Sequence, residues 1–212
     1  MYKVTYGTSN LFTLKKYENS NLNCQSYEYP TVYAIRSAIL GAIIQVDGLE
    51  TAKELFHKVK NAVIYVQYPR NFKINGCRIK RFANSFYDLK EENKIDRDYL
   101  ISKNFCTSMG FREYIYLEKI AFYIDNSIPN IELYLKNIDW LGTAESLVYL
   151  ESIKETNKLD RILKVNNDAN CKKYEQYDWS SKVKFENVYM FSDQYNKRQQ
   201  IKLMCAINDI EV

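Results

Sequence analysis

One long apolar segment near the N-terminus constrains the fold of this chain more than any other feature. Residues 29–48 read YPTVYAIRSAILGAIIQVDG, and large apolar side chains recur in steps of three and four at Val32, Ile35, Ile39, Ile43 and Val46. This spacing places them on one face of an α-helix. Pro30 stands before the first turn and Gly48 after the last, as is typical of helix ends. Because Arg36 is the one charged residue between Pro30 and Val46, we expect the helix to be buried on most sides.

A second, narrow strip runs along the same predicted helix. Tyr33, Ser37 and Gly41 follow one another at intervals of four, with Arg36 beside them. Two interpretations fit this strip. Either the helix packs on a sheet and Gly41 allows a strand to approach, or the strip lets another backbone come close and offers it the Arg36 guanidinium. With about 17 residues, a charge inside and turn signals at both ends, the segment is too short for a convincing membrane span.

The size and aromatic content of the chain indicate one substantial domain. Its 212 residues suffice for one large domain or for a domain with a smaller appendage, and 46% hydrophobic residues allow a proper core. Tyrosine is over-used, with 19 copies against 10 Phe and 2 Trp. Tyrosine suits half-buried strand faces and contact surfaces, because the ring packs while the hydroxyl stays in water. The net charge of +4 is mild, so the placement of charge matters more than its sum.

Cysteine and histidine usage argues against a disulfide framework and against a zinc site. The five cysteines are odd in number and scattered, no CxxC pair occurs, and the sole histidine, His57, has no metal-ligand neighbour at zinc spacing. Free thiols are typical of a reducing cytoplasm. The N-terminus MYKVTYGTSN lacks an apolar stretch of signal-peptide length. We therefore expect a cytoplasmic protein with no metal or other cofactor.

The order of the predicted elements matches a known arrangement. In chain order they are a short strand or hairpin at 2–6 and 11–14, the long helix, a second helix, a strand at 62–68, strands within 111–125 that break near 118–119, a short helix at 129–136 and a strand at 146–153. Thr51 and Glu54 have the spacing of a capping box, which predicts the start of the second helix. The resulting order is the ferredoxin-like (RRM-like) βαββαβ plan of the α+β class, with a long insertion at about residues 70–110.

The C-terminal part of the chain is patterned less clearly. Residues 154–181 are polar and weakly periodic, whereas 184–191 and 199–207 have the composition of two strands. We place a soft boundary near residue 155. This divides the chain into a ferredoxin-like domain at 1–155 and a small C-terminal β extension at 156–212.

The insertion begins with the most basic segment of the chain. Residues 70–81, RNFKINGCRIKR, contain no acid and five cations, which are Arg70, Lys73, Arg78, Lys80 and Arg81. Asn75-Gly76 is a strong hairpin signal and predicts a basic β-ribbon with arms at 71–74 and 77–80. Clustered cations interleaved with apolar residues suit a phosphate backbone and unstacked bases. The alternative is a hairpin tip that is merely made soluble by its charges.

Common catalytic patterns are absent from the sequence. It contains no Walker-type phosphate loop and no GxGxxG, HExxH or GxSxG motif. Triad chemistry would rest entirely on His57, which we interpret as a surface or boundary residue of the second helix. The acidic pair Glu91-Glu92 lies in a charge-rich stretch and is better interpreted as a solvated surface. We therefore predict no catalytic residue.

Three segments of the sequence resemble the CRISPR-associated Cas-five family of the RAMP superfamily. PTVYAIRSAILGAI (30–43) looks like the family's first-helix signature, and TSMGFREYIYL (107–117) is similar to its motif after the long insertion. IDWLGTAESLVY (138–149) looks like its glycine turn and following strand, although the family often has basic residues where this chain has Thr143, Ala144 and Glu145. The resemblance spans roughly residues 1–153, and the order of the motifs makes it fairly specific.

The resemblance implies a subunit of a type I CRISPR surveillance complex (Cascade), similar to types I-A and I-B. Such subunits have a protruding β-hairpin thumb, hold the 5′ handle of CRISPR RNA, and contact the Cascade large subunit and a Cas-seven backbone subunit. Carried over to this chain, Arg36 and Ser37 would face the handle, residues 70–81 would belong to the thumb, and Arg112 would lie at the base of the returning strand. Single-stranded RNA is held through phosphates, stacking and 2′-hydroxyls, in agreement with the composition of the basic segment.

Two alternatives stay open at the level of sequence. One branch of the family, type I-C, cuts repeat RNA without metal, using Tyr, Lys and His side chains as acid and base. His57 is in the wrong place for that role, which favours binding without cleavage, although Lys and Tyr could in principle act. The second alternative is a ferredoxin-like module whose tyrosine-rich faces bind only protein.

Overall fold

The long apolar segment folds into a helix that covers one face of an antiparallel sheet. In this computed structural model the described residues are 1–9, 11–16, 23–82, 107–166, 173–195 and 200–211, with side chains left out at 80–82, 107–108 and 209–211. Helix α1 (Val32–Asn61) begins at Thr31, whose hydroxyl accepts a hydrogen bond of 3.2 Å from the amide of Ala34. Ile35, Ile39 and Ile43 on the predicted apolar face are fully buried.

Gly48 divides α1 into two segments, and its backbone angles (φ 86°, ψ 176°) lie outside the helical region. The predicted capping box at Thr51 is wrong. Helical structure resumes immediately after Gly48, and the Thr51 hydroxyl donates to the Asp47 carbonyl at 3.0 Å. Helix α1 is long and apolar enough to cross a membrane. The buried core helix of a globular protein can have the same length and composition.

The sheet has the ferredoxin-like order. Its strands lie in the order β3-β6-β1-β7, and all neighbours are antiparallel. Their bounds are β1 (Tyr2–Thr8), β3 (Ile64–Val66), β6 (Lys119–Ile124) and β7 (Val148–Glu155). Helix α1 lies between β1 and β3, the first two strands of this sheet in chain order, and α3 (Ile131–Lys136) connects β6 to β7. This arrangement confirms the predicted α+β, ferredoxin-like class.

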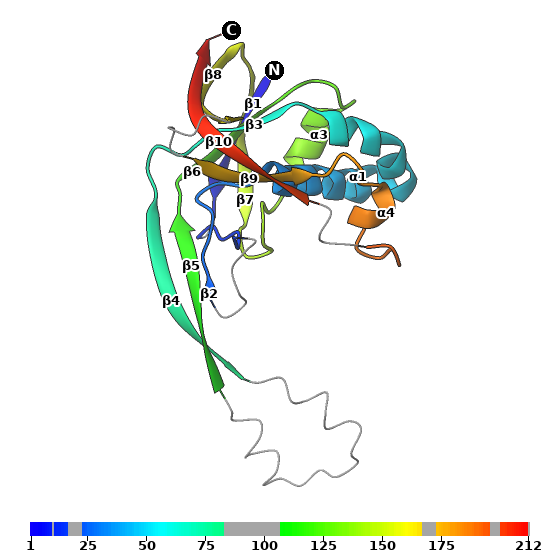
Figure 1. Ribbon diagram of the computed structural model, residues 1–212. Helices are drawn as coiled ribbons and strands as arrows, with labels where there is room; N and C mark the ends of the chain where they lie inside the picture. The colour runs from blue at the N-terminus through cyan, green and yellow to red at the C-terminus, as the bar shows by residue number, and fades with distance from the viewer. Residues whose placement is uncertain (10, 17–22, 83–106, 167–172, 196–199, 212) are drawn as a thin grey trace, which may run out of the picture.

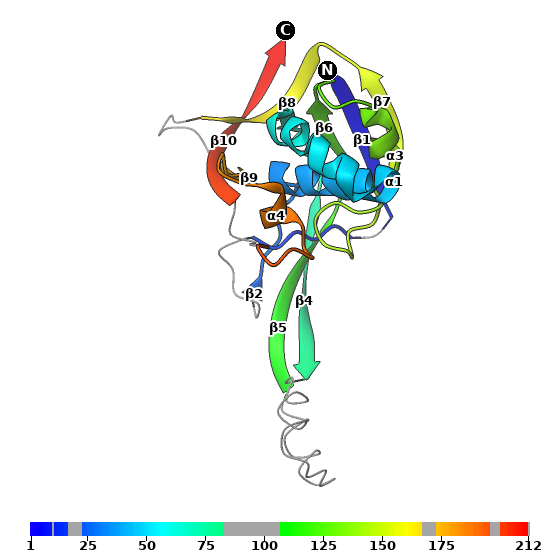
Figure 2. The same ribbon diagram turned by 90° about the vertical axis from the view of Figure 1, so that its right-hand side faces the viewer.

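A long two-stranded ribbon leaves this body between β3 and β6. Strand β4 (Lys73–Phe82) pairs antiparallel with β5 (Thr107–Tyr116) through ten residue pairs, and the short β2 (Asn23–Cys24) adds a parallel strand beside β5. Figures 1 and 2 show the ribbon projecting away from the sheet and helices. We call the β4–β5 pair the ribbon. The remainder of the insertion, 83–106, lies outside the described residues.

The turn predicted at Asn75-Gly76 is wrong, because both residues lie within β4, opposite Tyr114 and Glu113. The ring of Phe111 explains the glycine: a Cβ at position 76 would lie 2.7 Å from Cζ of Phe111. Gly76 therefore leaves room for an aromatic ring to pack across the strand, and the Asn-Gly pair does not mark a reversal of the chain.

Of the strand or hairpin predicted at 2–6 and 11–14, the strand at 2–6 is confirmed by β1, whereas a hairpin with 11–14 is wrong. Phe12 instead pairs with Ile115 of β5 through two backbone hydrogen bonds of 2.8 and 2.7 Å. Nearby, the backbone amide of Ser26 donates to the Glu113 carboxylate at 3.1 Å. Segments that precede α1 thus hold the base of the ribbon against the body.

The C-terminal part forms a second sheet in the order β8-β10-β9. Its strands are β8 (Lys158–Val165), β9 (Tyr174–Trp179) and β10 (Gln200–Glu211). The strand predicted at 199–207 is confirmed by β10, whereas β8 and β9 arise from the stretch that lacked a clear period. The strand predicted at 184–191 is wrong, because a short helix, α4 (Phe185–Val188), occupies it.

This second sheet shares its core with α1. The ring of Phe56 in α1 lies 5.3 Å from that of Trp179 in β9 and 5.8 Å from that of Phe185 in α4. On the other side, Leu159 and Ile162 of β8 pack against Tyr123 on the face of the first sheet that the helices leave open. β8 therefore covers only part of that open face, and the rest is accessible.

Candidate nucleic-acid interface

The ribbon presents different side chains on its two faces. Residues directly opposite in an antiparallel pair lie on the same face, and the face alternates along each strand. Lys73 lies opposite Tyr116, and Arg78 lies opposite Phe111, so these two pairs are on opposite faces. Lys73 and Arg78 are exposed, and Tyr116 keeps 59% of its surface accessible. An exposed cation beside an exposed aromatic ring can hold a phosphate and stack an unpaired base.

The predicted cations of the ribbon are only partly described. Neither Lys73 nor Arg78 forms an ion pair with any residue that the structure describes. The side chains of Lys80 and Arg81 lie outside the described residues, although their backbones continue β4 opposite Met109 and Ser108. Their role in binding stays a prediction.

Arg112 lies in the middle of β5, opposite Cys77, and not at the base of the ribbon, and it is already engaged. Its NH1 group donates to both carboxylate oxygens of Glu145, at 2.9 and 2.7 Å. A hydrogen bond to Tyr114 and the contact with Glu145 raise the pKa of Arg112 further above its ordinary value. A ligand phosphate would have to compete with Glu145 for this guanidinium.

Arg36 is not available to a ligand, which corrects the prediction that it faces RNA. The residue is 7% exposed, and its Nε donates to the Asp178 carboxylate at 2.7 Å. Its NH1 donates to the carbonyl of Val59 at 2.5 Å. A charge within an apolar helix must be paired where it is buried, and β9 supplies the partner that was not recognisable from the sequence.

Ser37 lies away from the ribbon, on an exposed part of α1. Its hydroxyl donates to the Tyr33 carbonyl at 2.8 Å. With Tyr33 and Gly41 it lines a small cleft of about 220 Å³ against the segment around Trp140. Within the described part of the chain, no strand packs on the strip: a Cβ at Gly41 would meet no atom within 4 Å.

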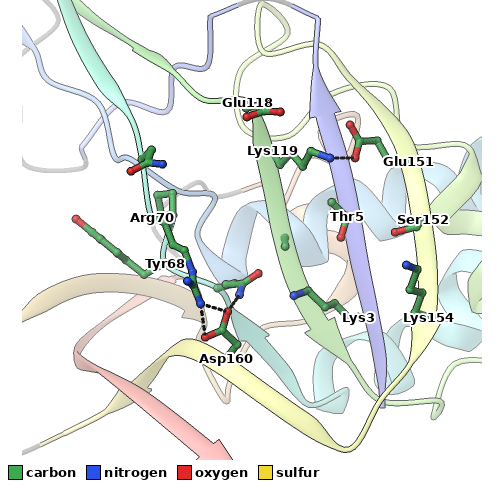
Figure 3. A pocket seen from close by; sticks show the side chains of 14 residues that line it. Lys3, Thr5, Tyr68, Arg70, Glu118, Lys119, Glu151, Ser152, Lys154 and Asp160 are labelled. Atoms are coloured by element: carbon green, nitrogen blue, oxygen red, sulfur yellow. Dashed lines mark hydrogen bonds and ion pairs between the residues drawn. The ribbon is translucent and has the colours of Figure 1, made fainter.

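A larger hollow lies on the open face of the first sheet and was not predicted. It has a volume of about 750 Å³, and Figure 3 shows side chains from β1, β6, β7 and β8 around it. Its basic side chains come from three strands and from the segment between β3 and β4, and comprise Lys3, Arg70, Lys119 and Lys154. The alternation of Lys3 and Thr5 along the first strand is a period-two signal that could have indicated a polar face here.

Two of these cations are neutralised within the hollow. Lys119 contacts Glu151 at 2.9 Å, and Arg70 contacts Asp160 at 3.1 Å. Glu151 raises the pKa of Lys119 through a hydrogen bond and its charge. Arg70 is nevertheless highly exposed, with 71% of its side chain accessible, so this pair can open at little cost.

The hollow continues toward the ribbon. A smaller cleft of about 440 Å³ shares Arg70, Asn71 and Glu118 with the hollow and adds Lys73 and Tyr116 of the ribbon. We call this cleft the neck. Through it, the accessible surface of the ribbon is continuous with that of the hollow.

Aromatic rings support the segment that forms the neck. The ring of Tyr68 lies 4.7 Å from that of Tyr174, 5.7 Å from that of Tyr29 and 6.2 Å from that of Phe72. Burial and the nearby carboxylate of Glu28 raise the pKa of Tyr68 to about 12. The phenol therefore remains protonated at neutral pH and acts as a packing group.

The histidine and the thiols lie apart from this surface. His57 is exposed on α1 and contacts the amide of Asn61, and it lines neither the hollow nor the neck. Cys24, Cys77 and Cys205 form no disulfide within the part of the chain that the structure describes, while Cys106 and Cys171 lie outside it. Within the described ranges, no group of three His, Cys, Asp or Glu side chains could hold a metal ion.

Comparisons with known proteins give a structural similarity but no sequence match. No protein-family model matches the chain, and no curated protein matches it. Among the similar solved structures is the crystal structure of a CRISPR protein from Archaeoglobus fulgidus, which is 13% identical, with 98% of this chain and 85% of that chain covered and a TM-score of 0.49. The ferredoxin-like strand order of this chain stands on its own hydrogen-bond registers.

Proposed function

We propose that this chain binds single-stranded RNA through the ribbon and the neck, as a non-catalytic subunit of a type I CRISPR surveillance complex. The ligand would be the 5′ handle of CRISPR RNA, and the protein partners would be a Cas-seven backbone subunit and the large subunit. The complex would act in antiviral defence in the cytoplasm. The three sequence segments that resemble the Cas-five family support the assignment to this complex.

The observation that carries the proposal is the position and chemistry of the ribbon. It is inserted between β3 and β6 of a ferredoxin-like sheet and projects from the body. It bears Lys73, Arg78 and Tyr116 as exposed side chains. Cations neutralise phosphates while an accessible ring stacks an unpaired base, and this combination favours single strands over duplexes.

Binding without cleavage is the form of the proposal that the side chains favour. Cleavage of RNA without metal needs a base for the 2′-hydroxyl and an acid for the leaving oxygen. His57 lies on α1 and not at the ribbon, the neck or the hollow. The tyrosines that pack beneath the neck, such as Tyr68, have raised pKa values and are poor bases at neutral pH.

The test is incubation of the purified full chain with its own CRISPR repeat RNA in EDTA, followed by a native gel and a denaturing gel. A retarded band with intact RNA is the expected result. RNA cut at a single position would replace this proposal with a repeat endoribonuclease. Because binding could require the neighbouring Cas-seven subunit, the same assay is run with that subunit added. No retention of RNA in either assay at low salt would leave the protein-interaction module as the better account.

A further inference from the structure

The floor of the hollow contains two lysines that face each other across neighbouring strands. Lys3 in β1 lies directly opposite Lys154 in β7, and Thr5 lies opposite Ser152 in the next pair on the same face. Figure 3 shows these four side chains lining the same side of the hollow. Like charges directly opposite on antiparallel strands destabilise a sheet. The pair therefore costs stability unless an anion lies near it.

Among the residues that the structure describes, no acidic side chain supplies that anion. Of the three carboxylates that line the hollow, Glu151 contacts Lys119 and Asp160 contacts Arg70. The third, Glu118, lies at the end shared with the neck. Among the described residues, Lys154 has no ion-pair partner, and Lys3 lies 5.5 Å from the centre of the Tyr123 ring.

We infer that the floor of the hollow is a phosphate-binding site, and that its ligand is a phosphodiester of single-stranded RNA. The two ammonium groups supply positive charge, and the hydroxyls of Thr5 and Ser152 can donate hydrogen bonds to phosphate oxygens. The inference rests on the proposed function, because it requires an RNA strand bound to the ribbon. The neck joins the ribbon to this hollow, so the same strand can reach both. The bound strand would pass from Tyr116 over Arg70 to Lys3 and Lys154.

The best test variant is Lys154→Glu, because this one substitution should weaken RNA binding without lowering the thermal stability of the free protein. It places a carboxylate opposite Lys3, which replaces a like-charge pair with an ion pair and leaves the free protein at least as thermostable. It also repels phosphate from the floor. The matched control is Lys136→Glu, which makes the same charge change at an exposed position on α3, outside the lining of the hollow.

The measurement is the dissociation constant for fluorescently labelled repeat RNA over a range of KCl concentrations, with melting temperatures taken in parallel. We expect Lys154→Glu to weaken binding about tenfold relative to Lys136→Glu. We also expect the slope of log K against log salt to become shallower by about 0.7 for each phosphate that the variant no longer neutralises. The melting temperature should not fall below that of the wild type.

Three results would overturn the inference in distinguishable ways. Equal affinity and equal salt slopes for the two variants would reject the site, while wild-type binding would leave the proposed function intact. Failure of the wild type to bind RNA would reject the proposed function and the inference together. Inorganic phosphate, added at matched ionic strength, should displace no more RNA than chloride does. Stabilisation of the wild type but not of Lys154→Glu by inorganic phosphate, together with equal RNA affinities for Lys154→Glu and Lys136→Glu, would assign the hollow to free phosphate instead of RNA.

Discussion

Arg36 in α1 and Asp178 in β9 form a buried ion pair that fastens the C-terminal sheet to the ferredoxin-like core. Two guanidinium nitrogens reach the two carboxylate oxygens, at 2.7 and 3.2 Å. The side chains are only 8% and 21% exposed. Arg36, the one charged residue between Pro30 and Val46, therefore serves the fold, and the C-terminal sheet is needed to satisfy it.

Removing one partner of this pair should destabilise the whole protein. Because Asp178→Asn leaves the Arg36 guanidinium buried without a counter-charge, we expect a loss of about 3 kcal/mol in the free energy of unfolding. Urea denaturation measures it, with Asp193→Asn at an exposed position as the control. The double variant Arg36→Met with Asp178→Leu should recover much of the loss. A change within about 0.5 kcal/mol for Asp178→Asn would contradict the structural role.

Gly76 and Phe111 should behave as a coupled pair. A methyl group at position 76 would lie 2.7 Å from Cζ of Phe111, so Gly76→Ala forces the ring to move and should cost about 1 kcal/mol. In the background Phe111→Ala the same substitution should be nearly neutral, because the ring is gone. A double-mutant cycle of unfolding free energies measures the coupling. Additive effects would show that the ring does not pack on the glycine.

Alkaline pH should unfold the protein through its tyrosines. Burial raises the pKa of Tyr68 and of Tyr134 to about 12, and it raises the pKa of Tyr27 and Tyr29 further. A phenol whose pKa is higher in the folded state stabilises that state fully below its ordinary value of about 10. This stability is lost as the pH rises from about 10 to about 12.

Tyrosinate absorbance and circular dichroism, followed together during an alkaline titration, test this prediction. We expect part of the tyrosinate signal to appear only as the secondary structure is lost. The urea midpoint should be flat between pH 7 and about 9 and should fall at higher pH. Complete ionisation of tyrosine while the circular dichroism stays native would contradict the burial of these rings.

The buried thiol of Cys205 should react more slowly than the thiol of Cys77. Burial raises the pKa of Cys205 to about 11, whereas Cys77 in the ribbon is only half-buried. The thiolate is the reactive form, so at pH 8 an alkylating reagent should label Cys77 before Cys205. Peptide mapping by mass spectrometry after short exposures gives the order, and a denatured sample serves as the control. Earlier labelling of Cys205 would contradict its place in the core.

The parts of the fold that were predictable are those with local signals. The apolar period of α1, the break near Glu118-Lys119 and the short helix at α3 each depend on neighbours in the sequence, and together they indicated the ferredoxin-like order. The errors arose where distant residues decide the local structure. Asn75-Gly76 extends a strand because Phe111 packs on it, and segment 11–14 pairs with Ile115 and not with β1.

In the candidate site, too, features with a local sequence signal were predictable and those that depend on distant residues were not. The basic run at 70–81 is contiguous, so the sequence displays it directly. Lys3, Lys119 and Lys154 are far apart in the chain and are brought together only by the register of β1, β6 and β7. The family resemblance predicts that Arg36 faces RNA, whereas its counter-ion, Asp178, is 142 residues away and leaves no local signal in the sequence.

The measurement that tests the central claim most directly is RNA binding by a variant in which the ribbon loses its charge. Arg78→Gln, Lys80→Gln and Arg81→Gln are combined, and a control carries three neutralised lysines on the helical side at Lys53, Lys58 and Lys136. The full chain is titrated with its repeat RNA at several salt concentrations. We predict that the ribbon variant binds at least tenfold more weakly, with a salt slope shallower by about 2. Equal binding by the ribbon variant and its control would show that the ribbon does not hold the RNA.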